Sequence, residues 1–316
     1  MKYSINKLYF GVDIGGTAIK FGAFTEDGNL LRKWEIPTDK AEHGTRILPS
    51  VAGEILRFAE NPEHVLAVGM GIPGPVQHGG FVRRCVNLGW GNVNPARELA
   101  ALLGGVPVFA ANDANMAAMG EYWKGGGQGA RSLVFMTLGT GVGGGIILDG
   151  RMDFGAGGLG GEIGHMIVDP TETLPCNCGQ YGCLDQIASA TGIVRCTKRM
   201  LEQAQDDSAL RKLDSITAKD VLDAAKAGDP LAAAAFDRCM YYLGKSMAML
   251  TNILDPEVYI IGGGVSKAGD YLTQTVKKHF DAMSTLSEQK ADIVLAKLGN
   301  DAGIYGAAKL AMDSAR

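Results

Sequence analysis

The sequence has little that would suit a membrane protein or a nucleic-acid-binding protein. None of its apolar stretches is long enough to span a bilayer, and the N-terminal MKYSINKLYFGVDIGG lacks the apolar core and cleavage site of a signal peptide. It has no basic tract, and its net charge of -4 gives no general attraction to nucleic acid. We therefore expect a cytoplasmic protein with no nucleic-acid partner and no membrane association.

Cysteine is also scarce, yet three of the six cysteines fall close together. With a preceding histidine they form the pattern H-x10-C-x-C-x4-C, whose members are His165, Cys176, Cys178 and Cys183. Three thiolates and one imidazole are the ligands of a closed tetrahedral zinc site that has no vacant position for a catalytic water. The pattern predicts a structural Zn²⁺ that pins a loop rich in glycine and proline. A disulfide is the alternative, but Cys-x-Cys closes a strained ring and three cysteines leave one unpaired.

Glycine, in contrast, is abundant, with 45 residues that cluster after apolar stretches and form no repeat. Three such clusters are Gly15-Gly16-Thr17, Gly139-Thr140-Gly141 and Gly262-Gly263-Gly264. Glycine turns expose successive backbone N–H groups and leave no Cβ in the path of a polyanion. Together the three clusters predict a nucleotide-phosphate site, although any one of them alone is equally consistent with a tight turn between strands.

The length and the apolar content of the chain indicate two lobes. At 316 residues and 46% hydrophobic composition, the chain can bury two cores. Residues 8–31 and 132–151 both read as an apolar strand, a glycine turn and a second strand, which suggests an internal duplication. Strands alternate with helices elsewhere, so we predict α/β lobes with mixed sheets. The smaller lobe is expected to comprise residues 1–115 and 300–316, and the larger lobe, with the zinc segment, residues 116–299.

Two acids at strand ends are the strongest candidates for chemistry. Asp113 ends an apolar strand beside Asn112, where its carboxylate can accept a proton from a substrate hydroxyl while the amide orients the same molecule. The alternative, equally weighted, is that Asp113 caps the helix that follows. Asp13 has the equivalent position after the first strand, where it can hold Mg²⁺ through water or face a phosphate; a plain hairpin-end acid is the alternative.

Other polar side chains near the glycine turns suggest a substrate with many hydroxyl groups. These side chains carry both donors and acceptors, and they are Asn87, Asn112, Glu162 and His165. Trp90 is a candidate for packing against the apolar face of a sugar, with ordinary core packing as the alternative.

Taken together, the motifs DIGGTAIK, GIPGPV, NLGW, ANDAN, LGTGVGGG, GGEIGH, CNCGQYGCLD and IIGGGV resemble the ROK family of sugar kinases and repressors, most of all its bacterial glucokinases. The resemblance runs in the family's order from about residue 8 to the last helix. It implies the actin-like ATPase fold shared with hexokinase and Hsp70, with nucleotide and sugar in a cleft between two lobes. It also implies ATP-dependent phosphorylation of a hexose at the 6-hydroxyl, with Mg²⁺, by a homodimer. Glucose is the first expected substrate, and N-acetylmannosamine, fructose and allose are the alternatives.

The resemblance assigns a role to each candidate residue. Asp113 would be the base for the 6-hydroxyl, and His165 would bind sugar through the ring nitrogen that zinc does not hold. Asn87, Asn112 and Glu162 would bind the sugar as well. The phosphates of ATP would lie at Gly15, Gly16, Thr17, Gly139, Thr140 and Gly141, and the adenosine near Gly262, Gly263 and Gly264.

One position departs from the family pattern. Asp185 stands where the family usually has a sugar-binding Glu, and the missing methylene draws the carboxylate back by roughly one bond length, enough to lengthen a hydrogen bond or place a water in it. This change weakens the choice of sugar but not the expectation of a kinase.

Two other functions compete with a kinase. One is a sugar-responsive repressor, but it needs a helix-turn-helix ahead of the first glycine strand, where only about seven residues stand. The other is a sugar sensor without turnover, and the presence of Asp113 beside Asn112 argues against it.

Overall fold

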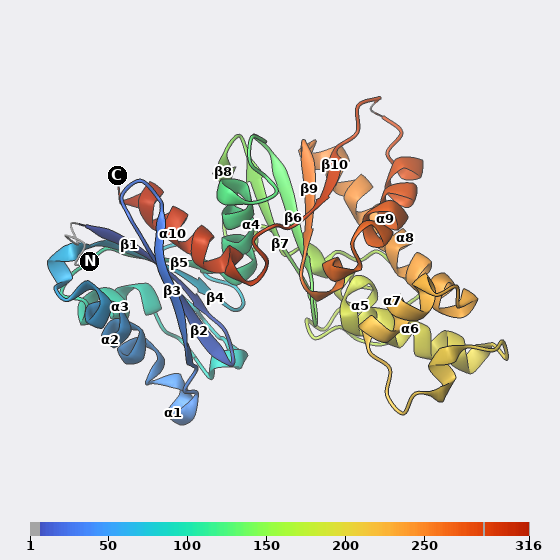
Figure 1. Ribbon diagram of the computed structural model, residues 1–316, viewed down its shortest axis with the longest axis horizontal. Coiled ribbons are helices and arrows are strands. Elements are labelled where there is room, and N and C mark those ends of the chain that lie inside the picture. The colour runs from blue at the N-terminus through green and yellow to red at the C-terminus, as the bar shows by residue number, and fades with distance from the viewer. Residues whose placement is uncertain (1–6, 287, 316) are drawn as a thin grey trace.

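Two five-stranded sheets organise the chain, and each forms the centre of one lobe (Figure 1). The structure is a computed structural model that describes residues 7–286 and 288–315. The strands are β1 (Leu8–Ile14), β2 (Ala18–Phe24), β3 (Leu30–Pro37), β4 (Val65–Ile72), β5 (Val108–Asn112), β6 (Leu133–Leu138), β7 (Val142–Leu148), β8 (Arg151–Met152), β9 (Val258–Gly262) and β10 (Asp292–Leu295). The helices are α1 (Ala41–Gly44), α2 (Ile47–Ala59), α3 (Pro95–Leu102), α4 (Asp113–Lys124), α5 (Asp185–Ala188), α6 (Ala190–Gln203), α7 (Ala218–Lys226), α8 (Pro230–Leu254), α9 (Asp270–Met283) and α10 (Ala302–Ser314). Short 3₁₀ helices are η1 (Pro62–His64), η2 (Val86–Leu88), η3 (Ile163–His165), η4 (Ala209–Lys212), η5 (Gly264–Ala268) and η6 (Gly299–Asp301).

Both sheets follow the same plan. The first has the order β3-β2-β1-β4-β5 and the second, read from its other edge, β8-β7-β6-β9-β10. In each sheet three strands form an antiparallel meander, and the next two join it in parallel. The α/β lobes with mixed sheets are therefore confirmed, and the strand plan that the sequence suggested for each half recurs in the two sheets.

The apolar pattern of the strands explains which of them are central. β4 and β9 are apolar almost throughout and buried almost throughout, as parallel strands covered on both faces must be. β3, at an edge, is mostly exposed or half-buried. In the second lobe, α8 turns one apolar face to the core, and the side chains on that face include Met240, Leu243, Met247 and Leu250, which are all buried.

Helices α4 and α10 cross between the lobes in direct backbone contact (Figure 1). A side chain at Gly306 of α10 would collide with the backbone oxygen of Met116 in α4, and one at Gly120 would collide with that of Ala302. The same lack of side chains lets α10 lie against the first sheet, where Gly69 of β4 meets the backbone of Ala307.

The chain passes between the two sheets twice, through residues 113–132 and 296–301, and one buried side chain holds both segments. Glu121 of α4 is 0% exposed. Its carboxylate accepts backbone N–H bonds from Gly126 (2.8 Å), Lys297 (3.0 Å) and Leu298 (2.7 Å). The boundaries predicted near residues 115 and 300 lie in these segments, and the division itself stays a prediction. Among the described residues, none of the helices is long and apolar enough to cross a membrane.

Candidate active site

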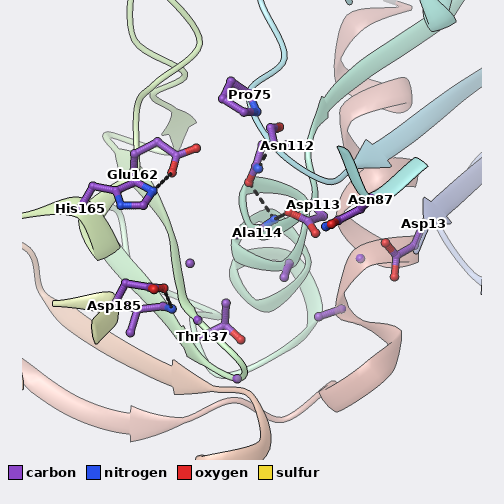
Figure 2. A pocket seen from close by; sticks show the side chains of 18 of the residues that line it. Asp13, Pro75, Asn87, Asn112, Asp113, Ala114, Thr137, Glu162, His165 and Asp185 are labelled. Carbon is purple, nitrogen blue, oxygen red and sulfur yellow. Dashed lines mark hydrogen bonds and ion pairs between the residues drawn. The ribbon is translucent and has the colours of Figure 1, made fainter. Parts of the chain in front are cut away.

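A cavity of about 990 Å³ opens between the two lobes, and both contribute to its wall (Figure 2). From the first lobe come Asp13, Lys20, Pro75, Asn87, Asn112 and Asp113. From the second come Thr137, Gly139, Gly141, Glu162, His165 and Asp185. The structure thus brings together residues that are up to 290 positions apart in the chain (from Asp13 to Gly303) around one cleft.

Asp113 is placed by the junction of β5 and α4. Asn112 ends the strand and caps the helix, because its Oδ1 accepts the N–H groups of Ala114 (2.8 Å) and Asn115 (3.2 Å). The amide nitrogen of Asn112 donates to the backbone oxygen of Gly74 at 3.1 Å. The capping role that the sequence left open for Asp113 therefore belongs to its neighbour, and Asp113 itself is the first residue of the helix, with its carboxylate on the cleft wall.

The carboxyl group of Asp113 has an unusual electrostatic environment. Its pKa is raised to about 6, mainly by burial and then by the negative charges of Asp13 and Glu162, against the opposing effect of the Ala114 N–H. The start of a helix favours an anion, so desolvation must outweigh this stabilisation. A carboxyl with a pKa of about 6 is ionised at neutral pH yet is a stronger base than an ordinary aspartate, which suits general base catalysis.

Asp13 lies on the same side of the cleft, against the N-terminus of α10 (Figure 2). A Cβ at Gly303 of that helix would lie 2.8 Å from the Asp13 carboxylate, so only glycine permits this approach. Burial raises the pKa of Asp13, and the positive charge of Lys20 opposes that rise. Lys20 is the cross-strand partner of Asp13 in the β1–β2 hairpin, and its Nζ donates to the backbone oxygen of Asn300 at 3.2 Å.

Glu162 and His165 face the cleft from a glycine turn on the second lobe (Figure 2). Gly164 lies so close to β7 that a side chain there would collide with the backbone of Val142, and Gly161 has a left-handed φ of 88°. His165 Nε2 lies 3.9 Å from Glu162 Oε2, which is an ion-pair distance and too long for a hydrogen bond. The two ring nitrogens therefore have different surroundings, since Nδ1 faces the cysteines.

The predicted metal ligands do meet in space. The ligand atoms of His165, Cys176, Cys178 and Cys183 all lie within 4.8 Å of one another. The Cys178 and Cys183 sulfurs are 3.6 Å apart, and His165 Nδ1 is 3.8 Å from Cys176 Sγ. A tetrahedral zinc site with ordinary bond lengths has ligand atoms roughly 3.5–3.8 Å apart, so these contacts match its edges. All six cysteines are free thiols in the described structure. Burial and the neighbouring thiols raise the pKa of Cys183 to about 12, so a thiolate there requires a cation.

Asp185 supports the glycine turn between β6 and β7 as well as lining the cleft. Its Oδ1 accepts the N–H of Val142 at 2.6 Å, and it occupies the space that a side chain at Gly141 would need. The shorter acid at this position is thus held against the turn rather than left free in the cavity.

The same turn is bonded to the start of α6. Ala190 N–H donates to the Gly139 oxygen at 2.8 Å, and the Thr191 hydroxyl donates to the Thr140 oxygen at 2.7 Å. Ala190 also belongs to the wall of a second cavity, of about 410 Å³, together with Leu222 of α7 and residues of η5. A residue on the wall of this second cavity is therefore hydrogen-bonded to the glycine turn of the main cavity.

Several predicted residues lie away from the wall of the main cavity. Thr140 is in the turn but is not on that wall, and Gly15, Gly16 and Thr17 form the β1–β2 turn beyond it. Gly262 ends β9 and Gly263 follows it, while Gly264 lines the second cavity. Their predicted contacts with ATP stay predictions. The sugar-packing role suggested for Trp90 does not fit, because its ring is buried and its Nε1 donates to Gly44.

Lys20, Thr137 and Asn300 are among the wall residues that were missed from the sequence. The register of the β1–β2 hairpin could have identified Lys20, because it pairs with Asp13 across the two strands. The two-residue period of a strand could have identified Thr137, because it lies two residues before Gly139 and so on the same face. Asn300 has no comparable signal, because it lies in the second crossing segment.

Comparison with known proteins is consistent with this geometry. A model of the ROK family matches residues 9–314. A glucokinase of Halalkalibacterium halodurans is 43% identical to this chain, over 95% of this chain and 94% of its own. The crystal structure of a ROK family glucokinase from Streptomyces griseus, in complex with glucose and AMPPNP, is 35% identical, with a TM-score of 0.77 over 97% of this chain and 99% of its own. A ROK hexokinase from Thermus thermophilus is 31% identical, with a TM-score of 0.83 over 97% of this chain and 98% of its own.

These likenesses confirm the expected actin-like ATPase fold. The family match extends over nearly the whole length, and the identity to full-length relatives is well above the level at which only the fold is shared. The chain belongs to the ROK family.

Proposed function

We propose that this protein is an ATP-dependent hexose kinase that phosphorylates the 6-hydroxyl of glucose. The observation that carries the proposal is the Asp113 carboxyl, which lies on the cleft wall with a pKa raised to about 6 and faces sugar-binding and phosphate-binding candidates on the opposite lobe. The relatives that are similar along their whole length include a glucokinase, and one solved relative holds glucose and AMPPNP. Glucose is therefore the substrate to test first.

In the proposed reaction, Asp113 accepts the proton of the 6-hydroxyl as the oxygen attacks the γ-phosphorus, and the bond between that phosphorus and the β–γ bridging oxygen breaks. Asn87 and Asn112 hold the sugar from the first lobe, and Glu162 and His165 hold it from the second. Glu162 accepts hydrogen bonds from sugar hydroxyls, and His165 contributes Nε2, the ring nitrogen that faces Glu162. Asp185 reaches the sugar with its second oxygen, because the first is bonded to Val142.

For the nucleotide, we propose that the phosphates lie along Gly139, Thr140 and Gly141 and face the turn at Gly15, Gly16 and Thr17. The adenosine then extends into the second cavity, past Gly264, with Gly262 and Gly263 shaping its entrance. The support for this path is Ala190, which links the two cavities. Asp13 is suited to hold a Mg²⁺ ion through water. It is a buried carboxylate close to the carboxylate of Asp113, and Lys20 supplies a positive charge that partly offsets its burial. Mg²⁺ supplies charge neutralisation to the phosphates when it is bound.

We assign a structural Zn²⁺ to His165, Cys176, Cys178 and Cys183. The spacing of the four donor atoms and their identity, one imidazole and three thiols, support this ion. It holds the Nδ1 side of His165, so the imidazole presents Nε2 to the sugar in one orientation. The ion therefore positions a substrate contact and takes no part in the transfer.

We propose a homodimer as the assembly. Its support is an exposed apolar stripe along α8, at the i, i+8 and i+12 positions Tyr241, Met249 and Ile253, of which Ile253 is 75% exposed. Light scattering coupled to size exclusion tests this assignment, and a monomeric mass at micromolar concentration contradicts it.

Initial rates with ATP and Mg²⁺ across a panel of hexoses test the proposed function. We expect kcat/KM to be highest for glucose, lower for N-acetylmannosamine, fructose and allose, and absent for 6-deoxyglucose, which has no 6-hydroxyl. Turnover of 6-deoxyglucose, or no turnover of any hexose in the panel, contradicts the proposal. A different hexose in first place corrects only the sugar.

A further inference from the structure

A third cavity, of about 380 Å³, lies behind the wall of the active-site cleft. Its lining comes from the loop after His165 and from α5, α6 and α8, and it shares no residue with the cleft. The proposed kinase reaction makes no use of it. Its volume is near the lower end of the range for small-molecule sites.

Three arginines and two carboxylates line this cavity. Arg199 forms a two-bond pair with Glu172, at 2.8 Å for each bond, so this pair is satisfied. Arg195 is 3.7 Å from Glu172, beyond hydrogen-bond reach, and donates to the backbone oxygen of Gln186. Arg238 lies 3.4 Å from Asp169, with 54% of its side chain exposed.

Each carboxylate accepts several hydrogen bonds, and one of those to Asp169 comes from Arg238 Nη2 at 3.4 Å. Asp169 accepts the Tyr242 hydroxyl at 2.8 Å and the Thr171 hydroxyl at 2.6 Å, and Glu172 accepts two backbone N–H groups in addition to Arg199. A guanidinium carries five N–H donors. Arg195 and Arg238 therefore keep donors that no carboxylate of the cavity takes up, and the cavity has one positive charge in excess.

Gln186 gives an independent indication of a ligand. It lines the cavity and is only 6% exposed. Its side-chain nitrogen donates to the backbone oxygen of Leu174 at 2.9 Å, which fixes the orientation of the amide. Its side-chain oxygen is buried and has no hydrogen-bond partner among the described residues. Buried acceptors without a partner are uncommon, and this one calls for a donor such as a hydroxyl group.

We propose that this cavity binds a small organic anion that also carries a hydroxyl group. Arg195 and Arg238 pair with the anionic group, and the Gln186 oxygen accepts a hydrogen bond from the hydroxyl. A sugar phosphate and a hydroxycarboxylic acid share this chemistry. The site is separate from the cleft, so the inference does not depend on the proposed kinase reaction.

The occupant would lie against the elements that shape the cleft. Gln186 follows Asp185, which holds the glycine turn through Val142. Helix α6, which carries Arg195, begins with the residues that bond Gly139 and Thr140. A ligand in this cavity therefore contacts the same two helices that support the phosphate turn.

Cys196 provides a local readout, because it lines the cavity. A hydrogen bond with Cys239, opposed by burial and supported by the positive arginines, lowers the pKa of Cys196 to about 7, so it reacts readily with iodoacetamide. The purified, zinc-loaded protein is alkylated with and without glucose 6-phosphate, citrate or inorganic phosphate, and the modification of Cys196 is followed by peptide mass spectrometry. We expect glucose 6-phosphate or citrate to slow the reaction about tenfold at about ten times the Kd. Whichever of the two protects identifies the class of ligand.

Arg238→Gln is the first variant, because this change should disturb the fold little. The Arg238 side chain is largely exposed, and Asp169 keeps its hydrogen bond from Tyr242 when the arginine is removed. We expect it to raise the Kd about tenfold by removing one charge-assisted pair, and Arg195→Gln to do the same. The matched control is Arg131→Gln, which removes a surface arginine paired with Asp149 elsewhere on the second lobe. For each variant, protection is the rate of Cys196 alkylation without ligand divided by the rate with ligand. Only variants whose zinc content is unchanged are compared. The proposal is overturned if none of the organic anions protects Cys196, if inorganic phosphate protects equally well, or if protection persists in both arginine variants.

Discussion

Replacing Asp113 with asparagine should make the protein more stable while it abolishes phosphorylation. The side chain keeps its size and its place at the start of α4, but it loses the negative charge and the ability to accept a proton. General base catalysis contributes about 10²–10⁴-fold to rate, so we expect kcat to fall by at least that range, with the sugar Kd nearly unchanged.

The stabilising effect follows from the pKa of this carboxyl. Burial raises it from 3.8 to about 6, which corresponds to at most about 3 kcal/mol of unfavourable free energy for keeping the group ionised in the folded protein. The unfolded chain ionises Asp113 first as pH rises. The penalty is therefore absent below about pH 3.8, grows between the two pKa values and is complete above about pH 6. Asparagine removes the penalty.

Urea unfolding of the wild type and Asp113→Asn at pH 8 and pH 4.5 measures this difference. We expect the variant to be more stable at pH 8 by up to about 3 kcal/mol and the gap to shrink at pH 4.5. Asp207→Asn, at an exposed acid, is the control and should show no such gap. Equal stability of the variant and the wild type at pH 8, or a gap that does not depend on pH, refutes the claim that the cleft holds Asp113 as a strained base.

Four further changes test other parts of the structure. Because the charge of Asp13 helps to raise the pKa of Asp113, Asp13→Asn should move the acid limb of kcat/KM, expected near pH 6, to lower pH; an unmoved limb contradicts this coupling. Cys178→Ser should lower the zinc content and the melting temperature together, and unchanged metal stoichiometry counts against the structural site. Asp185→Glu should crowd the glycine turn that the shorter acid supports and shift the relative kcat/KM values of the hexoses, whereas an identical hexose profile shows that the position is neutral. Glu121→Gln should lower the free energy of unfolding in urea by about 2–4 kcal/mol, because an amide cannot accept all three backbone N–H groups. A loss below about 1 kcal/mol contradicts the claim that Glu121 holds the two crossing segments together.

The sequence was informative wherever a residue's role depends on its local pattern. Asp113 was found because it ends an apolar strand, and the H-x10-C-x-C-x4-C spacing located four ligands that meet in space. The strand and helix succession predicted two mixed sheets, because apolar runs and glycine turns are short-range signals.

Properties that depend on packing between distant segments were out of reach. The raised pKa of Asp113 depends on its burial and on the charges of Asp13 and Glu162, which approach it from separate elements, and local patterns do not encode either. The sequence left open whether Asp113 is a base or the cap of the following helix, since aspartate is a good cap and only the backbone conformation shows that Asn112 has that place. The sequence left the role of Trp90 open between a sugar contact and ordinary packing, because the burial of an indole ring, which decides between them, depends on distant segments.

The position of the phosphate on the product tests the central claim most directly. The protein and its Asp113→Asn variant are incubated with glucose, ATP and Mg²⁺, and the product is examined by proton–phosphorus correlation NMR. We predict that the wild type gives a single ester whose phosphorus couples to the two C6 protons, and that the variant gives no detectable ester under the same conditions. An ester at another carbon, or comparable turnover by the variant, contradicts the assignment of Asp113 as the base for the 6-hydroxyl.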